Sequence, residues 1–189
     1  MAAKITADGM WRVTYGDIPG LSNEDYKKRL PMRYQQILPG NPKIGEYEVT
    51  NIGPYKMHQR LAPKLRVGRI LLAADAAHLC NPFGGFGLIG GIADVSDLSQ
   101  CLPGIHNGNA DDEILDKYDE VCSSRHRTVV DRLSTLNFQR LWMNDPESTA
   151  NNDPWLSTVR KATHDKGIAS ELQKSSLDLL YDFTQHYNP

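Results

Sequence analysis

The sequence contains few cysteines, no long apolar run and no excess of charge of either sign. Its three cysteines form no CxxC pair, and an odd number argues against a disulfide framework, so we expect reduced thiols. The longest apolar run covers only residues 70–74, far fewer than a bilayer requires, and the N-terminus lacks the apolar core of a secretory signal. The net charge of −2 gives no reason to expect a nucleic acid or an anionic membrane as partner. These absences predict a cytoplasmic protein.

The sequence also lacks the local motifs of several enzyme classes. There is no HExxH motif, and His126, His164 and His186 are scattered along expected helices, so we expect no metal site. Neither a GxSxG nucleophile motif nor a Cys–His signature is present. The composition, 40% hydrophobic and 23% charged over 189 residues, indicates a globular chain with one core.

The N-terminal third shows strand, turn and helix signals. Residues 2–7 and 11–15 are rich in β-branched and aromatic side chains and flank an Asp-Gly pair, which predicts a β-hairpin. A helix is expected over residues 22–38, and Pro31 is expected to kink or split it. Residues 46–60 alternate in polarity and are predicted to form one long strand or two.

From Ile89 onward the apolar spacing becomes helical. A first helix is expected to end at Pro103-Gly104, and a second covers roughly residues 112–142. This order of elements predicts an α+β fold, a small antiparallel sheet followed by a helical C-terminal half. The first helix places five residues on one face: Ile92, Val95, Leu98, Ser99 and Leu102. The last expected elements are a polar linker, 144–154, and two helices, 155–165 and 168–187.

The centre of the chain carries the most specific motif. A short apolar run, residues 69–73, predicts a buried strand that ends in Ala74-Asp75-Ala76-Ala77-His78. A loop rich in glycine follows, and a helix then begins near Gly90-Gly91. Glycines let the backbone approach a ligand closely, a helix N-terminus offers free N–H groups, and a carboxylate at a strand end can accept from hydroxyls. The segment therefore predicts a site for a flat, polar ligand.

The pattern G-R-hydrophobic-L-A-x-D-A-A-H…P-x-G-G-x-G-x-x-x-G-I-x-D resembles the second flavin motif of the para-hydroxybenzoate hydroxylase-like, phenol-hydroxylase-type FAD-dependent monooxygenases. The resemblance covers roughly residues 1–145. It implies that Asp75 bonds the ribitol chain, that the loop 82–87 lies beside the isoalloxazine, and that the next helix points its N-terminus at the flavin carbonyls. The implied flavin contacts are Asp75, Gly84, Gly85, Gly87 and Gly90.

Two family features that bind FAD are missing, and one is altered. No G-x-G-x-x-G unit for the ADP pyrophosphate occurs, and the mid-chain motif of the family is absent. Ala74 stands where the family has glycine, which is unfavourable if that residue has a positive φ. We therefore expect no tightly bound cofactor for this chain alone. The resemblance divides the chain into a substrate-sheet segment, 1–67, a remnant of the FAD-binding domain, 68–110, and C-terminal helices, 111–189.

Two explanations of the missing half lead to different functions. If the chain is whole, as its leading Met favours, a flavin scaffold has been reused as a flavin-independent enzyme that cyclises, rearranges or isomerises an aromatic, polyketide- or terpenoid-type molecule. If it is a fragment, or is completed by a partner chain, it belongs to an FAD-dependent monooxygenase that uses NAD(P)H. A non-catalytic binding or accessory protein is the third alternative. Because the missing half would bare sheet edges and an apolar face, we expect a homodimer, or the missing half, to cover them.

Candidate catalytic residues lie on the strand end and on the preceding strand. Asp75 is a general acid or base, or else a cap of the loop, and His78 is a titrating group or a structural hydrogen bonder. Arg60 binds an anionic oxygen or faces solvent, and Tyr55 joins it as a further candidate. Asp94 and Asp97 are expected to satisfy the helix dipole. The expected substrate pocket consists of Trp11, Tyr15, His58, Pro82, Phe83 and Phe86, of which the two hairpin aromatics have core packing as the alternative.

Overall fold

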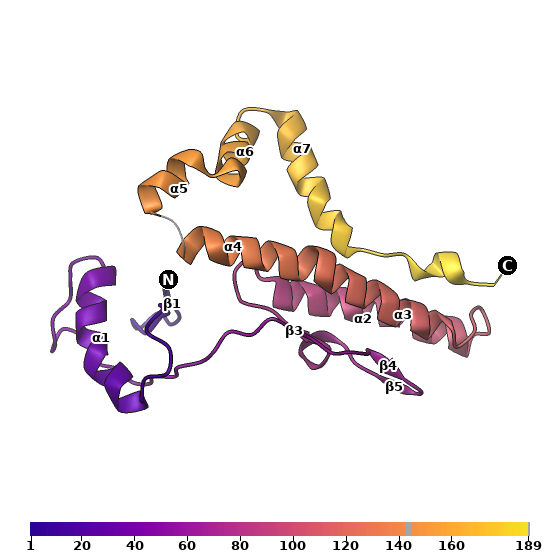
Figure 1. Ribbon diagram of the computed structural model, residues 1–189, viewed down its shortest axis with the longest axis horizontal. Helices are drawn as coiled ribbons and strands as arrows, with labels where there is room; N and C mark the ends of the chain where they lie inside the picture. Colours follow the sequence, from indigo (N-terminus) through magenta and orange to yellow (C-terminus); the bar gives the residue numbers. More distant parts are fainter. Residues whose placement is uncertain (143–144, 189) are drawn as a thin grey trace. The chain divides into compact units, whose positions relative to one another are not determined.

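The computed structural model describes residues 1–142 and 145–188, and Figure 1 shows its helices and short strands. The chain forms two compact units, Met1–Lys56 and Met57–Pro189. The architecture is mostly helical with small two-stranded antiparallel sheets, which confirms the predicted α+β class. The three segments expected from the resemblance remain a prediction. Among the described helices, none has the length and apolar character needed to cross a membrane.

The first unit contains the predicted hairpin and helix. Strands β1 (Ala2–Lys4) and β2 (Trp11–Val13) pair antiparallel, and the turn between them includes Gly9 with a φ of 104°. Helix α1 (Asn23–Ile37) begins where the Ser22 side chain accepts a hydrogen bond from the Asp25 N–H. The helix is continuous through Pro31, so the prediction of a split was wrong: one missing backbone hydrogen bond is outweighed by the turns on either side.

The predicted long strand over residues 46–60 is wrong. Residues 46–59 have no strand conformation, and only the last predicted position begins β3 (Arg60–Leu61). Alternating polarity makes a strand possible, but a strand also needs a neighbour that pairs with its backbone. No strand among the described residues pairs with 46–59.

The second unit opens with four two-residue strands. β3 pairs antiparallel with β6 (His78–Leu79), and β4 (Arg66–Val67) pairs with β5 (Ile70–Leu71). The strand expected over residues 69–73 is therefore shorter than predicted. It is also not buried, because Ile70 is 68% exposed in a hairpin with one partner strand.

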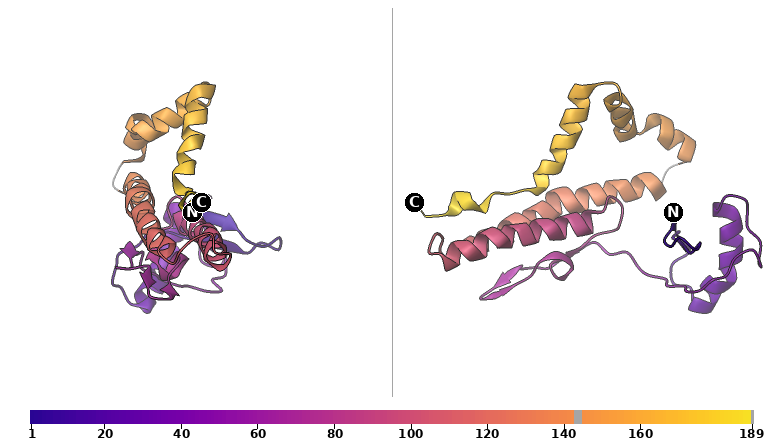
Figure 2. Two further views of the ribbon diagram at one scale, coloured as in Figure 1. Left: turned by 90° about the vertical axis from the view of Figure 1, so that its right-hand side faces the viewer. Right: turned by 180° about the vertical axis from the view of Figure 1, so that it is seen from behind.

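Two long helices lie beside these strands (Figures 1 and 2). Helix α2 (Phe86–His106) passes through Pro103, so its predicted end was about three residues too early. Helices α3 (Ile114–Arg125) and α4 (Arg132–Trp142) are joined without a break by a π-helical segment, His126–Asp131, which confirms one long helix over about residues 112–142. The core between strands and helices is formed by Leu65, Ala77, Cys101, Ala110, Ile114, Leu115, Tyr118, Cys122 and Phe183.

The C-terminal region leaves the core and returns to it. The predicted linker 144–154 contains helix α5 (Pro146–Asn152), a correction, while the first predicted linker position lies outside the described residues. Polar composition did not prevent a helix there, because Pro at a first helical position is favourable. Helices α6 (Pro154–Ala162) and α7 (Lys166–Lys174) follow, and α7 gives way to two 3₁₀ turns instead of continuing to residue 187.

The last residues are held against α2 and α3. Phe183 is completely buried, and its N–H donates to the Gln100 side chain on α2 (2.8 Å). Arg125 on α3 donates to the Leu179 carbonyl (2.9 Å), and Tyr187 donates its hydroxyl hydrogen to the Gln100 carbonyl (2.6 Å). The tail thus closes one end of the core of the second unit.

Candidate functional site

The strand-end turn is a 3₁₀ turn, Ala74–Ala76, after β5. Ala74 has a φ of +54°, in the left-handed region that favours glycine. Ala74 therefore meets the condition under which replacement of the family glycine was expected to be unfavourable. Asp75 at the centre of the turn is exposed, and no described residue forms a hydrogen bond with its side chain, so its carboxylate is free to meet a ligand.

A buried carboxylate on α2 holds this turn. Oδ2 of Asp94 accepts hydrogen bonds from the Ala74 N–H (2.9 Å) and from Nε2 of His78 (2.8 Å). His78 in turn stacks on His126 from the π-helical segment, with ring centroids 4.8 Å apart. Burial alone would raise the pKa of Asp94, but the hydrogen bonds from His78 and Ala74 bring it below its usual range. Burial, and then the neighbouring His78, lower the pKa of His126.

The neighbouring carboxylate, Asp97, is also buried, and it is paired with Arg125 of α3. Asp94, Asp97 and Cys122 each bring one possible metal ligand atom within 4.8 Å of the others. The Arg125 guanidinium contacts both Asp97 and Cys122, and it therefore supplies the positive charge that pairs with the buried Asp97 carboxylate. The expectation that Asp94 and Asp97 serve the helix dipole was wrong, because both face the core instead of the helix end.

Helix α2 turns its small and acidic residues inward and its apolar residues outward. Gly90, Gly91, Asp94 and Asp97 are buried. The helix packs so closely on the strand-end turn that a Cβ on Gly91 would lie 2.9 Å from the Ala74 Cβ, and only small residues permit that approach. Most of the face that helical spacing identified is exposed to solvent. The exposed apolar side chains are Ile92 (61%), Val95 (59%) and Leu102 (48%) of that face and the neighbouring Leu88 (74%) and Ile89 (44%).

The glycine loop precedes α2 and is fixed to α4. Gly84 and Gly85 have φ values of 110° and 71°, and the first turn of α2 has no side-chain cap among the described residues. Asn137 donates to the Phe83 carbonyl (3.2 Å), and Gln59 accepts from the Asn81 backbone N–H while donating to Asp131 (2.6 Å). The loop is therefore held by side-chain bonds, and its end presents uncapped backbone N–H groups.

The predicted catalytic residues have different surroundings. Asp75 is exposed, whereas His78 is buried with Nε2 bonded to Asp94, which assigns it the structural role that was one of its two interpretations. Arg60 pairs with Leu79 across the small sheet, and its side chain is exposed. Tyr55 lies in the first unit and is 60% exposed.

The predicted pocket residues are divided between the two units. Trp11 and Tyr15 belong to the first unit, where Tyr15 packs edge-on against Tyr34 with centroids 6.2 Å apart. His58 is exposed in the second unit, as is Pro82 in the glycine loop. Phe83 packs against Phe138 with centroids 5.7 Å apart, and Phe86 opens α2. The pocket itself remains a prediction.

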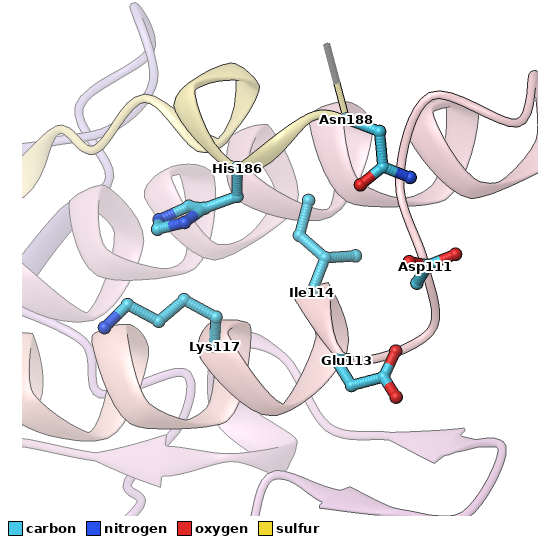
Figure 3. A pocket seen from close by; sticks show the side chains of 6 residues that line it. All are labelled: Asp111, Glu113, Ile114, Lys117, His186 and Asn188. Atoms are coloured by element: carbon cyan, nitrogen blue, oxygen red, sulfur yellow. The ribbon is translucent and has the colours of Figure 1, made fainter.

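A cavity of about 530 Å³ lies at the other end of α2 (Figure 3). Asp111 and Glu113 come from the connection between α2 and α3, Lys117 from α3, and His186 from the C-terminal tail. A helix of 21 residues is roughly 30 Å long, so this cavity is remote from the glycine loop at the start of α2. It plays no part in the candidate site.

Sequence reasoning missed Asp94, His126, Gln59 and Asn137 as members of the site. One signal could have found the first of them. Gly90, Asp94, Asp97 and Cys101 recur at helical spacing and therefore share one face of the helix. Small residues beside two carboxylates on that face indicate close packing against a polar backbone. The other three contact the site over more than 20 residues of sequence, for which the local pattern carries no signal.

The FAD binding domain family matches residues 16–133. The chain is 35% identical over 153 residues to the para-nitrophenol 4-monooxygenase of Pseudomonas sp. (strain WBC-3), covering 81% of this chain and 38% of that protein. It is 35% identical over 162 residues to the 6-hydroxy-3-succinoylpyridine 3-monooxygenase HspB of Pseudomonas putida, covering 85% of this chain and 40% of that protein. The chain therefore spans about two fifths of the length of these curated relatives.

Two solved structures are also similar to this chain over part of their length. The crystal structure of p-nitrophenol 4-monooxygenase PnpA from Pseudomonas putida DLL-E4 superposes with a TM-score of 0.78 and 32% identity, over 94% of this chain and 44% of that chain. The rebeccamycin biosynthetic enzyme RebC with reduced flavin shares the fold, with a TM-score of 0.56 and 23% identity. More than half of each of these two chains has no counterpart here.

Proposed function

The chain belongs to the FAD binding domain family, and from this premise we propose that it is the flavin-facing portion of an FAD-dependent monooxygenase that hydroxylates a small aromatic substrate with NAD(P)H. The observation that carries the proposal is the joint presence of the strand-end carboxylate, the fixed glycine loop and the uncapped helix start within the matched residues. Three of the proteins named above are monooxygenases by name, two of them acting on a nitrophenol and one on a hydroxypyridine.

The residues present fit part of a flavin. A Cβ added at Gly85 would meet no atom within 4 Å, so the start of α2 is open to a ligand. Asp75 offers an exposed acceptor for hydroxyls, and the first N–H groups of α2 can donate to carbonyl oxygens. The Ala74 Cβ lies against Gly91 of α2, which places the extra methyl group in helix packing. When bound, the flavin would supply the electrons that activate dioxygen.

The outward apolar face of α2, defined as Leu88, Ile89, Ile92, Val95 and Leu102, supports the need for a further portion. These residues are between 44% and 74% exposed on one helix. A contiguous apolar surface of this kind marks an interface. Since the relatives are more than twice as long as the matched part, the proposed cover is the remaining portion of the monooxygenase, on the same or a separate polypeptide.

Flavin binding with and without that portion tests the proposal. The chain is purified alone and after co-expression with the unmatched part of the p-nitrophenol 4-monooxygenase. We expect a colourless chain alone, and co-purification of the two parts with FAD absorbing near 450 nm. A chain that neither retains FAD in the pair nor supports NAD(P)H oxidation with a nitrophenol would overturn the proposal. Matched variants Ile92→Ser, on the outward face, and Ser124→Ala, exposed on α3, separate loss of docking from general instability.

Flavin-independent cyclisation, rearrangement or isomerisation of a polyketide- or terpenoid-type molecule stays a prediction. Of the side chains expected to catalyse it, His78 is engaged with Asp94. Turnover of such a substrate by the colourless chain without NAD(P)H would favour it. Light scattering of the chain alone tests the expected homodimer, in which a second copy covers the outward apolar face.

A further inference from the structure

The conformation of Ala74 requires a cause. A residue with a Cβ is disfavoured in the left-handed region, because the Cβ crowds the following carbonyl oxygen. Ala74 nevertheless has a φ of +54°, and it directly precedes the exposed carboxylate of Asp75. In the turn, the Ala77 N–H donates to the Ala74 carbonyl (2.8 Å).

Two contacts with α2 favour this conformation. The Ala74 N–H donates to Oδ2 of Asp94 (2.9 Å), and the Ala74 Cβ occupies the space left by the absent Cβ of Gly91. A hydrogen bond to a charged acceptor is among the stronger polar interactions. Asp94 is 1% exposed, so water does not compete for the carboxylate.

The Asp94 carboxylate is itself held in place by His78. His78 donates from Nε2 to the same oxygen, since an ionised carboxylate can only accept. The His78 ring lies between Gly90, whose added Cβ would be 3.4 Å from it, and the His126 ring. Nδ1 of His78 has no partner among the described residues, so the hydrogen bond from Nε2 to Asp94 is the one that holds this ring.

We propose that Asp94 is a positioning residue, which holds Ala74 in the left-handed conformation and thereby sets where Asp75 is presented. His78, packed against His126, keeps the Asp94 carboxylate in place. What Asp75 meets rests on the proposed function, whereas the conformational role of Asp94 is a property of this chain alone. Asp97 is the natural control, because it is equally buried on the same helix but contacts Arg125 instead of the turn.

Amide hydrogen exchange in the full 189-residue chain tests the role of Asp94 without flavin. The readout is the amide of Ala77, whose bond to Ala74 closes the turn. We expect Asp94→Asn to speed exchange at Ala77 about tenfold beyond any change in core amides, the size that the penalty for a left-handed alanine implies. Adding Ala74→Gly should restore protection, since glycine adopts the conformation without help. Asp97→Asn should leave Ala77 unchanged relative to the core.

The outcomes separate positioning from a merely structural role. Exchange at Ala77 that follows the core amides in Asp94→Asn, or that Ala74→Gly does not restore, would overturn the inference. If Asp94→Asn alone does not fold, folding of the double variant with Ala74→Gly supports the inference, and failure of both overturns it. Because none of these measurements involves FAD, their result is independent of whether the flavin-binding experiment succeeds.

Discussion

The two units of this chain are ordered by different means. In the first unit, all of whose residues are described, Leu30 is the one buried hydrophobic residue, at 6% exposure. Its contacts are a tyrosine cluster of Tyr15, Tyr34 and Tyr47 and an ion pair between Asp17 and Arg29. The second unit has a continuous buried core with polar groups inside it. The candidate site therefore lies in the unit with the continuous core, whereas the first unit relies on aromatic and ionic contacts between partly buried side chains.

Truncating a core side chain in each unit should give the largest contrast. Phe183→Ala removes a completely buried ring that pins the tail to α2, and we expect a loss of about 3–5 kcal/mol in unfolding free energy. Leu30→Ala should cost about 2 kcal/mol, the low end for such truncations, because its surroundings are loosely packed. Urea unfolding, monitored by hydrogen exchange of peptides from each unit, measures the loss of unfolding free energy in both variants. Leu177→Ala, 56% exposed in the same tail, is the control, and equal losses for Phe183→Ala and Leu30→Ala would contradict the contrast.

Removing one arginine from each unit tests whether the polar contacts of the two units contribute differently to stability. Arg125→Met leaves Asp97 buried without its partner, and we expect a loss of about 3–5 kcal/mol. Arg29→Met removes one partner of Asp17, whose side chain is 8% exposed, but Arg33 remains nearby (3.6 Å), so a smaller loss is expected. Thermal unfolding of the two variants provides the test. A larger effect of Arg29→Met would show that the first unit depends on its ion pair.

Acid should weaken the second unit through His126. Its pKa is lowered in the folded chain, by burial and by His78, so the unfolded chain takes up a proton first as the pH falls below about 6.5. Folded stability is therefore lost as the pH falls through that value towards the lowered pKa. His126→Phe, which keeps the ring on His78, should flatten this loss between pH 7 and pH 5. The exposed His164, changed to Phe, serves as control, and an unaltered pH profile in His126→Phe would refute this assignment.

The smallest effect is expected at the helix cap of the first unit. Ser22→Ala removes the acceptor for the Asp25 N–H, at a cost of about 1 kcal/mol. We expect faster amide exchange in α1 with no change in the second unit. Ser96→Ala, an exposed site on α2, is the matched control. Propagation of the Ser22→Ala effect into α2 would mean that the two units unfold as one.

Local signals were sufficient for elements that depend on local physics. The Asp-Gly turn predicted the hairpin, a cap at Ser22 or Asn23 predicted the start of α1, and helical spacing predicted the long helix over 112–142. Alternating polarity wrongly predicted a strand over residues 46–60, because the pattern does not show whether a neighbouring strand exists. The motif around Asp75 identified the family, which the match to residues 16–133 confirms.

The interior of the candidate site could not be predicted in the same way. The bond from His78 to Asp94 and the stack of His78 on His126 join residues 16 and 48 positions apart, and they depend on how helices pack. The orientation of α2 was missed for a related reason. Spacing identifies an apolar face, but whether that face meets this chain's own core or another surface is decided by the rest of the fold.

The π-helical segment between α3 and α4 lets the two parts of the long helix make different contacts. A π turn takes in one more residue than an α turn, and so it rotates everything beyond it about the helix axis. Before the segment, Tyr118 and Cys122 face the hydrophobic core; after it, Ser134 and Asn137 face Gln59 and the glycine loop. The segment thus changes which side of the helix faces inward, so that one continuous helix contacts the core along one face and the glycine loop along another.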